Sequence, residues 1–422
     1  MNRFVFVDYS FDETGLAAFS YRYDDLEYTE KVQFMLDSQA YDRDVLDRAL
    51  FLVFLLIGVS YYKAFPVSQV ELGEHKIDEW QAEFLNLVYQ EGLSQFAYEN
   101  NLTRSDLAQF EMTGESGGPV DYDGRGIIAL QSGGKDSLLL AAMLKERQLD
   151  FSSLYISSSQ AYPTVIDEIG VPVRLIGRQI DREALAEATE RGGKNGHVPV
   201  TYIVLAIALI QTILDGKNTV LAAIGHEGEE PHAWIDDLPV NHQWSKTWQA
   251  EQSLADYIKR YIAPQIRVGS PLRQYSELAI ARLFVDKAWQ KYGWSFSSCN
   301  VANYSQGVDN SRLTWCGSCP KCANSYLLFA PFIDASELQA VFGGEDLFAQ
   351  AALVDTFKGL LGVDGVIKPF ECVGEVDELR SAYHQAQARG GFAALPFDVP
   401  PSNFDADTRY PSQDLLNDEM VK

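Results

Sequence analysis

The chain is poor in sulfur and in positive charge. Five cysteines and five methionines occur among 422 residues, and 34 lysines and arginines stand against 59 aspartates and glutamates, for a formal net charge of −25. So few cysteines in so long a chain do not indicate a disulfide framework, and four of them crowd between Cys299 and Cys322. An acidic surface repels phosphate backbones, which argues against a general nucleic-acid binder.

Long apolar runs are also missing. The start of the sequence turns acidic at Asp8, before any apolar stretch of signal-peptide length. The longest apolar run, residues 49–59, is shorter than the roughly 18 residues that a membrane span needs. We therefore expect a cytoplasmic protein with no membrane partner, in which this run forms a buried helix.

What the chain does have is enough apolar and aromatic residues, 46% and 12%, to bury a sizeable core. Its length suggests two or three domains. The acidic excess lies in the first 120 and the last 92 residues, while the middle is nearly neutral. We predict an α+β N-terminal domain over 1–115, a catalytic core over 124–333, a helical region over 334–395 and an extended or disordered tail over 396–422.

Strand-like and helix-like segments alternate in the core, which is typical of an α/β doubly wound parallel sheet with helices on both faces. The predicted strands are 126–131, 153–157, 171–176 and 219–224, and the predicted helices are 136–148 and 199–214. The N-terminal region differs, because its period of two over residues 3–35 predicts a hairpin or small meander. Helices are predicted over 44–65 and 77–98.

The hexapeptide Ser-Gly-Gly-Lys-Asp-Ser stands where the first core strand gives way to a helix. Two glycines let a backbone approach an anion, and the following helix aims free N–H groups at it. Lys135 adds positive charge, and Asp136 can hold Mg²⁺. A phosphate-binding loop is therefore favoured over a serine-capped glycine turn. Its candidate residues are Ser132, Gly133, Gly134, Lys135, Asp136 and Ser137.

This loop resembles the PP-loop of the N-type ATP pyrophosphatases, whose signature is SGGxDS. The resemblance implies a HUP-like sheet, ATP and Mg²⁺ as cofactors, and cleavage of ATP to AMP and pyrophosphate while a substrate oxygen is adenylated. A Walker loop is not indicated, because Asp136 follows the lysine where that loop has serine or threonine.

Three cysteines recur at intervals of three, at Cys316, Cys319 and Cys322, with Cys299 upstream. Such a knuckle can present three thiolates to one ion, and a fourth completes a tetrahedron, so we predict a structural Zn²⁺ site. A redox dithiol at 316–319 and four reduced core cysteines are the alternatives. Cys372 stands apart and is expected to be a buried thiol or a packing residue.

Residues 194–246 hold most of the remaining polar chemistry. His197 precedes an apolar helix, His226 and Glu227 follow a strand, and His242 and Lys246 lie in one polar and aromatic segment. Ligands bind beyond strand ends in open α/β sheets, which makes these groups candidates for the site, although a single histidine is more often structural. Cationic candidates for an anionic substrate, unless each simply pairs with an acidic neighbour, are Arg267, Arg273, Arg282 and Arg312.

Several longer strings resemble the UDP-N-acetyl-α-D-muramoyl-L-alanyl-L-glutamate epimerases, the MurL family. They are NGHVPVT (195–201), VNHQWSK (240–246), SSCN (297–300), WCGSCPKC (315–322) and KPFECVGE (368–375). The resemblance reaches about residue 385. His226 departs from the asparagine expected there, and the proline-rich end is unmatched.

The MurL resemblance implies ATP-dependent epimerisation of the terminal L-glutamate of UDP-MurNAc-L-Ala-L-Glu in peptidoglycan precursor synthesis. Adenylating a carboxylate acidifies its α-proton, so an enolate-like intermediate can form and be reprotonated from the other face. On this hypothesis the loop holds the phosphates, and His197, His242 and Lys246 are the candidate proton donors and acceptors.

Two other functions stay open at this point. The cysteine knuckle is similar to that of the 7-cyano-7-deazaguanine synthases, so the protein could be a nucleobase- or RNA-modifying synthetase, although neither flank supplies a basic RNA-binding module. A non-catalytic ATP-binding regulator would instead use its acidic regions to contact a protein. The oligomeric state and the role of the N-terminal domain are not given by the sequence.

Overall fold

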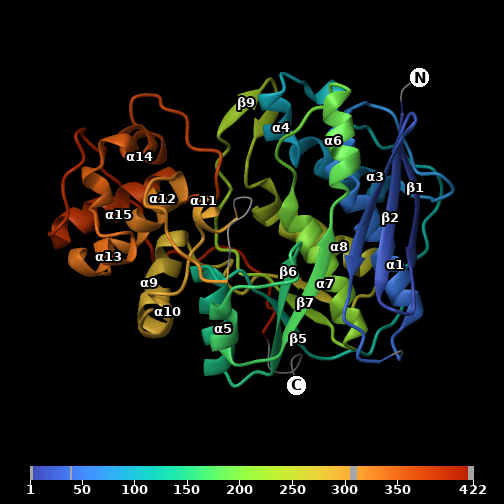
Figure 1. Ribbon diagram of the computed structural model, residues 1–422, viewed down its shortest axis with the longest axis horizontal. Helices are drawn as coiled ribbons and strands as arrows, with labels where there is room; N and C mark the ends of the chain where they lie inside the picture. The colour runs from blue at the N-terminus through green and yellow to red at the C-terminus, as the bar shows by residue number, and fades with distance from the viewer. Residues whose placement is uncertain (1–2, 39, 305–310, 417–422) are drawn as a thin grey trace.

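A single mixed sheet runs through the molecule (Figure 1). The computed structural model describes residues 3–38, 40–304 and 311–416. Within them, nine strands pair in the order β11-β8-β5-β6-β7-β3-β2-β1-β4. Their bounds are β1 Phe4–Phe11, β2 Leu16–Tyr23, β3 Leu26–Gln33, β4 Val70–Glu71, β5 Ile127–Leu130, β6 Phe151–Ser157, β7 Val173–Gln179, β8 Thr219–Leu221 and β11 Arg267–Gly269. Strands β9 (Ala233–Ile235) and β10 (Leu238–Val240) form a separate ribbon.

The central part of the sheet is parallel, which confirms the predicted α/β class. Strand β5 lies in the middle, with β6 and β7 to one side and β8 and β11 to the other. The chain therefore reverses its direction of winding between β5 and β8. Ligands of open α/β sheets bind at such a switch point, beyond the carboxyl ends of the strands.

The N-terminal strands extend this same sheet. The predicted meander is present as β1 to β3, and β3 pairs antiparallel with β7 through residues Lys31–Gln33. The first turn forms because Asp12 Oδ1 accepts hydrogen bonds from the amides of Thr14 and Leu16, while Gly15 takes a positive φ of 83°. The N-terminal region is thus joined to the core by backbone hydrogen bonds.

Helices cover both faces of the sheet and create two hydrophobic cores. Ile127 and Ile128 are neighbours on β5 whose side chains point to opposite faces, and they belong to different cores. The core that contains Ile128 packs the N-terminal helices, α7 and α8, whereas the core that contains Ile127 packs α5, α9 and the C-terminal helices.

The helix bounds on the first face are α1 Arg43–Ile57, α2 Val59–Tyr62, α3 Glu79–Asn86, a π-helix Leu87–Glu91, α4 Ser94–Glu99, α6 Arg182–Glu190, α7 Val200–Leu214 and α8 Trp248–Tyr261. On the second face and beyond it they are α5 Lys135–Glu146, α9 Glu277–Lys287, α10 Trp289–Tyr292, α11 Asn300–Asn303, α12 Pro320–Phe329, α13 Ala335–Val341, α14 Val354–Leu360 and α15 Val376–Arg389. Short 3-10 turns join several of them, at 104–106, 164–169, 244–246, 347–349 and 351–353. The single helix predicted over 77–98 is wrong, since a π-helical turn and Gly92 break it into separate pieces.

The helical stretch Arg43–Tyr62 is long and apolar enough, by length and composition, to cross a membrane. Asp42 caps its start by accepting hydrogen bonds from the amides of Asp44 and Val45. Of its 18-residue apolar window, 83% is buried inside the protein. This confirms the predicted buried helix. Its apolar residues pack against α7 and the meander.

Residues 396–416 form an extended arm along the surface, without helix or strand. Asp407 pairs with Arg282 of α9, and Gln413 donates hydrogen bonds to Glu251 Oε1 and the carbonyl of Val268. Leu415 is buried in the second core. The arm therefore ties the edge strand β11 to the helices of the other face, while residues 417–422 lie outside the described part of the chain.

Candidate active site

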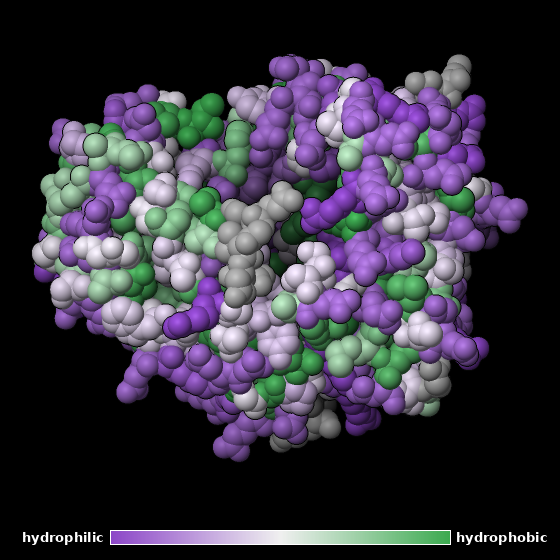
Figure 2. Space-filling model, in the orientation of Figure 1, coloured by the Kyte–Doolittle hydropathy of each residue, from purple (hydrophilic) through white to green (hydrophobic). Residues whose placement is uncertain are grey.

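A cavity of about 490 Å³ lies at the carboxyl ends of β5, β6 and β8. Its walls come from the 132–137 loop, the start of α7, the 222–227 segment after β8, Lys246, the first half of α12, and Cys372. Figure 2 shows this face of the molecule hollowed near its centre, between the C-terminal helices and the N-terminal half. The cavity thus occupies the switch point of the parallel sheet, as expected for a ligand site.

The 132–137 loop has the geometry of an anion cradle. Gly133 takes φ +77°, and a Cβ there would lie 2.4 Å from Leu313 Cδ1, so only glycine fits. Helix α5 begins at Lys135, and its N-cap, Gly134, has no side chain to cap the first amides, while the amide of Gly134 itself donates a hydrogen bond to Ser132 Oγ at 3.3 Å. Ser137 Oγ accepts a hydrogen bond from the amide of Ser132 at 3.2 Å. Free amides of a helix start therefore meet a loop held in shape by its own serines.

Lys135 lies buried between two carboxylates. Its Nζ is 2.6 Å from Asp136 Oδ1 and 2.6 Å from Glu277 Oε2 at the start of α9. Burial lowers the pKa of Lys135, but the two carboxylates outweigh burial and raise that pKa above its ordinary value. Burial raises the pKa of Glu277 to about 8, against the opposing charge of Lys135. The lysine is thus cationic, and its charge beside the loop is balanced by the neighbouring carboxylates.

A second ion pair, between the half-buried Lys246 and the buried Glu227, faces the same cavity. Lys246 Nζ lies 3.2 Å from Glu227 Oε2. Burial lowers the pKa of Lys246, yet the negative charges of Cys372, Glu227 and Glu277 outweigh burial and raise that pKa, so the amine stays protonated. The sequence-predicted Lys246 therefore lines the cavity as an ammonium group.

Arg273 holds this wall in place from behind. It is fully buried, pairs with Glu251, and donates hydrogen bonds to the carbonyls of Gly225 at 2.7 Å and Lys246 at 2.8 Å. Both segments that carry the Lys246–Glu227 pair are thereby fixed to one guanidinium. Arg273 is thus a structural residue. Of the other cationic candidates, Arg267 bonds Thr219 and the arm, Arg282 pairs with Asp407, and Arg312 is exposed.

The predicted histidines come together, but beside the cavity. The rings of His197 and His242 have centroids 4.4 Å apart, and His232, which sequence reasoning missed, lies 6.3 Å from His242 and stacks on Phe370. Burial lowers the pKa of His197 and His232 to about 3 and that of His242 to about 4. We call His197, His232 and His242 the histidine cluster. None of the three is among the described residues that line the cavity.

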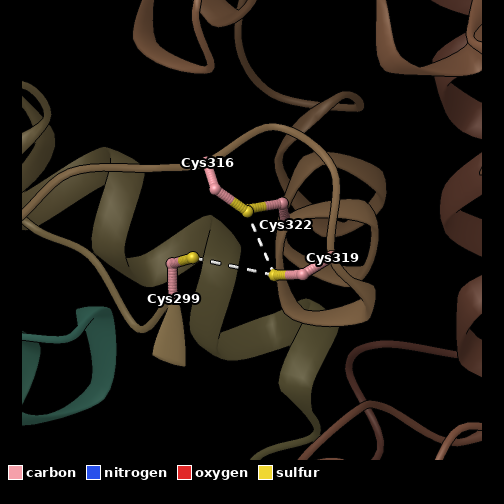
Figure 3. A group of neighbouring side chains, drawn as sticks. All are labelled: Cys299, Cys316, Cys319 and Cys322. Atoms are coloured by element: carbon pink, nitrogen blue, oxygen red, sulfur yellow. Dashed lines mark hydrogen bonds between the residues drawn. The ribbon is translucent and has the colours of Figure 1, made fainter. Parts of the chain in front are cut away.

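The four cysteines converge as their spacing predicts (Figure 3). Their Sγ atoms all lie within 4.8 Å of one another, with Cys299 and Cys319 3.6 Å apart, Cys316 and Cys322 3.7 Å apart, and Cys319 and Cys322 3.5 Å apart. Sulfurs bound to one tetrahedral Zn²⁺ at about 2.3 Å would lie about 3.8 Å apart. The cluster therefore fits a metal such as zinc, in which these four cysteines would be the ligands.

The cysteine cluster is physically joined to the phosphate loop. The amide of Ser297 donates to the carbonyl of Gly133, and Tyr304 OH donates to the carbonyl of Ser132. Helix α12 starts at Cys319 and brings Lys321 and Asn324 to the cavity wall. A bound metal would thus fix the wall opposite the sheet.

Three further residues of the cavity wall were not predicted. Glu277 comes from α9, and Gln131, at the end of β5, has neither its amide oxygen nor its nitrogen paired with another described residue. Cys372, expected to be a buried thiol or a packing residue, is half-buried and lines the cavity. Position after a strand could have drawn attention to Gln131, and Cys372 lies within the string KPFECVGE that resembles the MurL family; no local sequence signal marks Glu277.

Comparison with known proteins places the chain in a family. The MurL N-terminal domain matches residues 1–270, and the MurL C-terminal domain matches residues 295–397. The chain belongs to the MurL family. The MurL N-terminal domain includes the whole nine-stranded sheet and Lys246, whereas the C-terminal domain carries the cysteine cluster and Cys372. The cavity is therefore built by both domains, and the arm lies almost wholly beyond them.

Relatives over most of the length carry one name, UDP-N-acetyl-alpha-D-muramoyl-L-alanyl-L-glutamate epimerase. The Xanthomonas oryzae pv. oryzae protein is 34% identical over 395 residues, covering 90% of this chain and 85% of the relative. The Salinispora tropica protein is 35% identical over 407 residues, covering 94% and 87%. A Micromonospora protein is 33% identical over 389 residues, covering 90% and 85%.

Proposed function

We propose that this MurL protein is an isomerase that epimerises the terminal L-glutamate of UDP-MurNAc-L-Ala-L-Glu to D-glutamate, in the cytoplasmic synthesis of peptidoglycan precursors. The reaction adenylates a glutamate carboxylate at the expense of ATP and releases AMP and pyrophosphate. The name shared by its relatives supports the substrate. The observation that carries the mechanism is one cavity that joins the 132–137 loop to the Lys246–Glu227 pair.

The loop is the proposed site of the ATP phosphates. Its sequence is that of a PP-loop, and the order β7-β6-β5-β8-β11 of the parallel strands is consistent with a HUP-like sheet. The loop amides and Lys135 would hold the phosphates, with Ser132 and Ser137 as hydroxyl donors. Asp136, partly exposed at the loop, would hold Mg²⁺, which neutralises phosphate charge when bound.

Adenylation solves the chemical difficulty of the epimerisation. An α-proton beside a free carboxylate is poorly acidic, because its removal gives a dianion. Once the carboxylate is an acyl-adenylate, the electron pair left at Cα can spread onto the acyl oxygen. The ammonium group of Lys246 in a dry, charged wall would stabilise that developing negative charge and can donate a proton. His197 and His242 stay predicted proton-transfer groups.

Zinc at the four-cysteine site would be structural. All four tetrahedral positions are taken by thiolates, so no position stays open for a substrate. The proposed role of the metal is to hold α12 and the 297–304 segment against the phosphate loop.

The direct test combines two measurements on one reaction. The purified protein is incubated with ATP, Mg²⁺ and UDP-MurNAc-L-Ala-L-Glu, pyrophosphate is measured, and the glutamate recovered after hydrolysis is resolved by chirality. We expect pyrophosphate release that depends on the dipeptide nucleotide, together with D-glutamate. Asp136→Asn is the matched variant, expected to lose both signals while leaving the fold intact.

Two results would contradict the proposal. Pyrophosphate release with 7-carboxy-7-deazaguanine, but not with the muramoyl dipeptide, would favour a nucleobase-modifying synthetase. D-glutamate formed at an unchanged rate without ATP would exclude the adenylate route.

A further inference from the structure

Cys372 lines the cavity, and the two residues that follow it are held by hydrogen bonds. Gln243 Nε2 donates a hydrogen bond to the carbonyl of Val373 at 2.9 Å, and the amide of Gly374 donates to Asn324 Oδ1 at 3.0 Å. Gln243 belongs to the segment that carries Lys246, and Asn324 belongs to α12, which starts at the cysteine cluster. The backbone beside Cys372 is therefore fixed to two walls of the cavity, as expected for a side chain with a defined position.

Lys246 is the cationic neighbour of this thiol. Both side chains line the cavity, and the negative charges of Cys372 and Glu227 are among those that raise the pKa of Lys246. The thiolate is the reactive form of cysteine, and an ammonium group in the same cavity can balance its charge. Glu227 and the carbonyl contacts of Arg273 hold the Lys246 segment in this arrangement.

Unsatisfied polar groups mark the same cavity as a ligand site. Gln131 is 6% exposed, and its amide oxygen and nitrogen both lack a hydrogen-bond partner in the described part of the chain. Glu277 is also 6% exposed, and its Oε1 is likewise unpaired. Buried polar groups are rarely left without partners, because each costs about 1–3 kcal/mol. A ligand with both donors and acceptors would satisfy them next to the phosphate loop.

The other ionisable groups of this wall are already engaged. Lys135 is shared by Asp136 and Glu277, and Glu227 is bound to Lys246. Cys372 is not part of the four-cysteine cluster, whose sulfurs already complete a tetrahedron. The thiol can thus accept a proton without breaking a carboxylate–amine pair.

We propose that Cys372, acting as a thiolate beside Lys246, is the base that removes the α-proton of the adenylated glutamate. This inference rests on the proposed function. The S–H bond forms as the Cα–H bond breaks, and the electron pair of that bond moves into a Cα–C double bond while negative charge develops on the acyl oxygen. The thiol then returns its proton to solvent, and Lys246 keeps its positive charge through this step. Cys372 is therefore a catalytic residue, and Lys246 stabilises charge on both the thiolate and the enolate-like oxygen.

The experiment separates adenylation from proton removal. Cys372→Ala and the isosteric Cys372→Ser are compared with the wild type for the first equivalent of pyrophosphate released with ATP, Mg²⁺ and UDP-MurNAc-L-Ala-L-Glu. In parallel, incorporation of deuterium at the glutamate Cα is followed in D₂O. We expect pyrophosphate release within about threefold of wild type and deuterium incorporation lowered by about 10²-fold or more, the usual size of a general-base effect. Zinc content and thermal unfolding report whether each variant is folded.

The outcomes distinguish this inference from the proposed function. If the wild type releases pyrophosphate and either folded variant incorporates deuterium near the wild-type rate, Cys372 is not the base. If the wild type itself neither releases pyrophosphate nor exchanges the α-proton with this nucleotide, the proposed function fails first.

Alkylation of the wild type gives a second measurement that needs no variant. In the zinc-loaded protein, iodoacetamide should modify Cys372 faster than the four clustered cysteines. We expect ATP with the dipeptide nucleotide to slow that modification at least fivefold, as mapped by mass spectrometry. An alkylation rate that these nucleotides leave unchanged would overturn the placement of the thiol in the substrate cavity.

Discussion

The cavity wall and the histidine cluster are two polar regions that share the segment 240–246. The wall faces the cavity and is charged, whereas the cluster lies outside the cavity lining and is neutral. Lys246 and Glu227 form an ion pair that faces the cavity, whereas His197, His232 and His242 pack against one another and against aromatic side chains outside its lining. The same short segment, residues 240–246, contributes to both. Polar composition alone therefore does not separate a charged wall from a neutral, packed cluster.

The difference arises from what each group meets when it is buried. Lys246 meets carboxylates, which keep its charge in spite of burial. His242 meets another imidazole and the side-chain oxygen of Gln95, so burial dominates and the ring is neutral. A neutral ring with a pKa of about 4 is a weak base for a carbon acid. The comparison predicts large effects of substitutions at the wall and small ones at the cluster.

The largest effect is expected from Cys319→Ser. Loss of one thiolate would remove the metal, and structural zinc contributes on the order of 10 kcal/mol to the domains that it holds. We expect less than 0.2 equivalents of zinc, loss of pyrophosphate release, and new protease cleavage between residues 297 and 330. The core that contains Ile128 should stay protected. Cys372→Ser is the matched control, expected to keep one zinc. A zinc-free Cys319→Ser protein with normal turnover would contradict a structural role for the cluster.

The next largest effect is expected at the wall itself. Lys246→Met removes the charge but keeps most of the side-chain volume, and it should lower kcat by about 10²- to 10³-fold. Because Glu227 would be left buried without its partner, the double variant Lys246→Met/Glu227→Gln tests whether misfolding explains the loss. It should recover stability and not kcat.

His197→Ala and His242→Ala sharpen this contrast, since both histidines are predicted proton-transfer groups that lie outside the cavity lining. From their neutral, packed surroundings we expect kcat within about tenfold of wild type. A loss in either variant as large as that of Lys246→Met, with normal folding, would assign the histidine cluster to the chemistry and break the comparison.

The histidine cluster should affect the pH dependence of stability even though it has little effect on activity. A histidine with an unfolded pKa near 6.5 and a folded pKa of about 4 is neutral in both states well above pH 6.5. In that range its titration does not change the free energy of unfolding. Below that pH the unfolded chain binds the extra proton, and stability falls until the folded pKa is reached. His242→Gln removes this titration. We expect the wild type to lose about 2 kcal/mol relative to the variant between pH 7.5 and pH 5, measured by urea unfolding. A pH-independent difference would contradict the low pKa.

Sequence reasoning located those parts of the site that are encoded by local spacing. The hexapeptide at 132–137 forms a strand-to-helix loop, and the four cysteines converge, because a tight turn and a CxxC knuckle are set by neighbouring residues. Glu277 escaped notice because it lies 142 residues from its partner Lys135. Likewise, the string KPFECVGE marks the surroundings of Cys372, but that its thiol lines a cavity depends on the fold.

For the fold, too, locally encoded features could be predicted from the sequence and long-range contacts could not. Alternation of strands and helices gave the parallel sheet and its class, since each segment is determined by its own periodicity. That the N-terminal meander continues the same sheet depends on β3 meeting β7, which no local pattern encodes. His226 and the C-terminal end are the two departures from the MurL pattern, and they lie far apart in the sequence. The fold brings them into contact, because the ring of His226 stacks on Tyr410 of the arm, with centroids 3.5 Å apart and planes 5° apart.

The smallest expected effect comes from that stack. His226 is adjacent to Glu227 in the cavity wall. The arm therefore contacts the wall through His226 and does not itself line the cavity. Tyr410→Ala should cost about 1 kcal/mol of stability, the usual value of an aromatic pair, and change kcat by less than threefold, while Tyr410→Phe should match wild type in both. Thermal unfolding and steady-state kinetics measure the two quantities. If Tyr410→Ala lowered kcat as far as Lys246→Met does, the arm would be acting on the wall itself, and the contrast between chemistry inside the cavity and packing outside it would no longer hold.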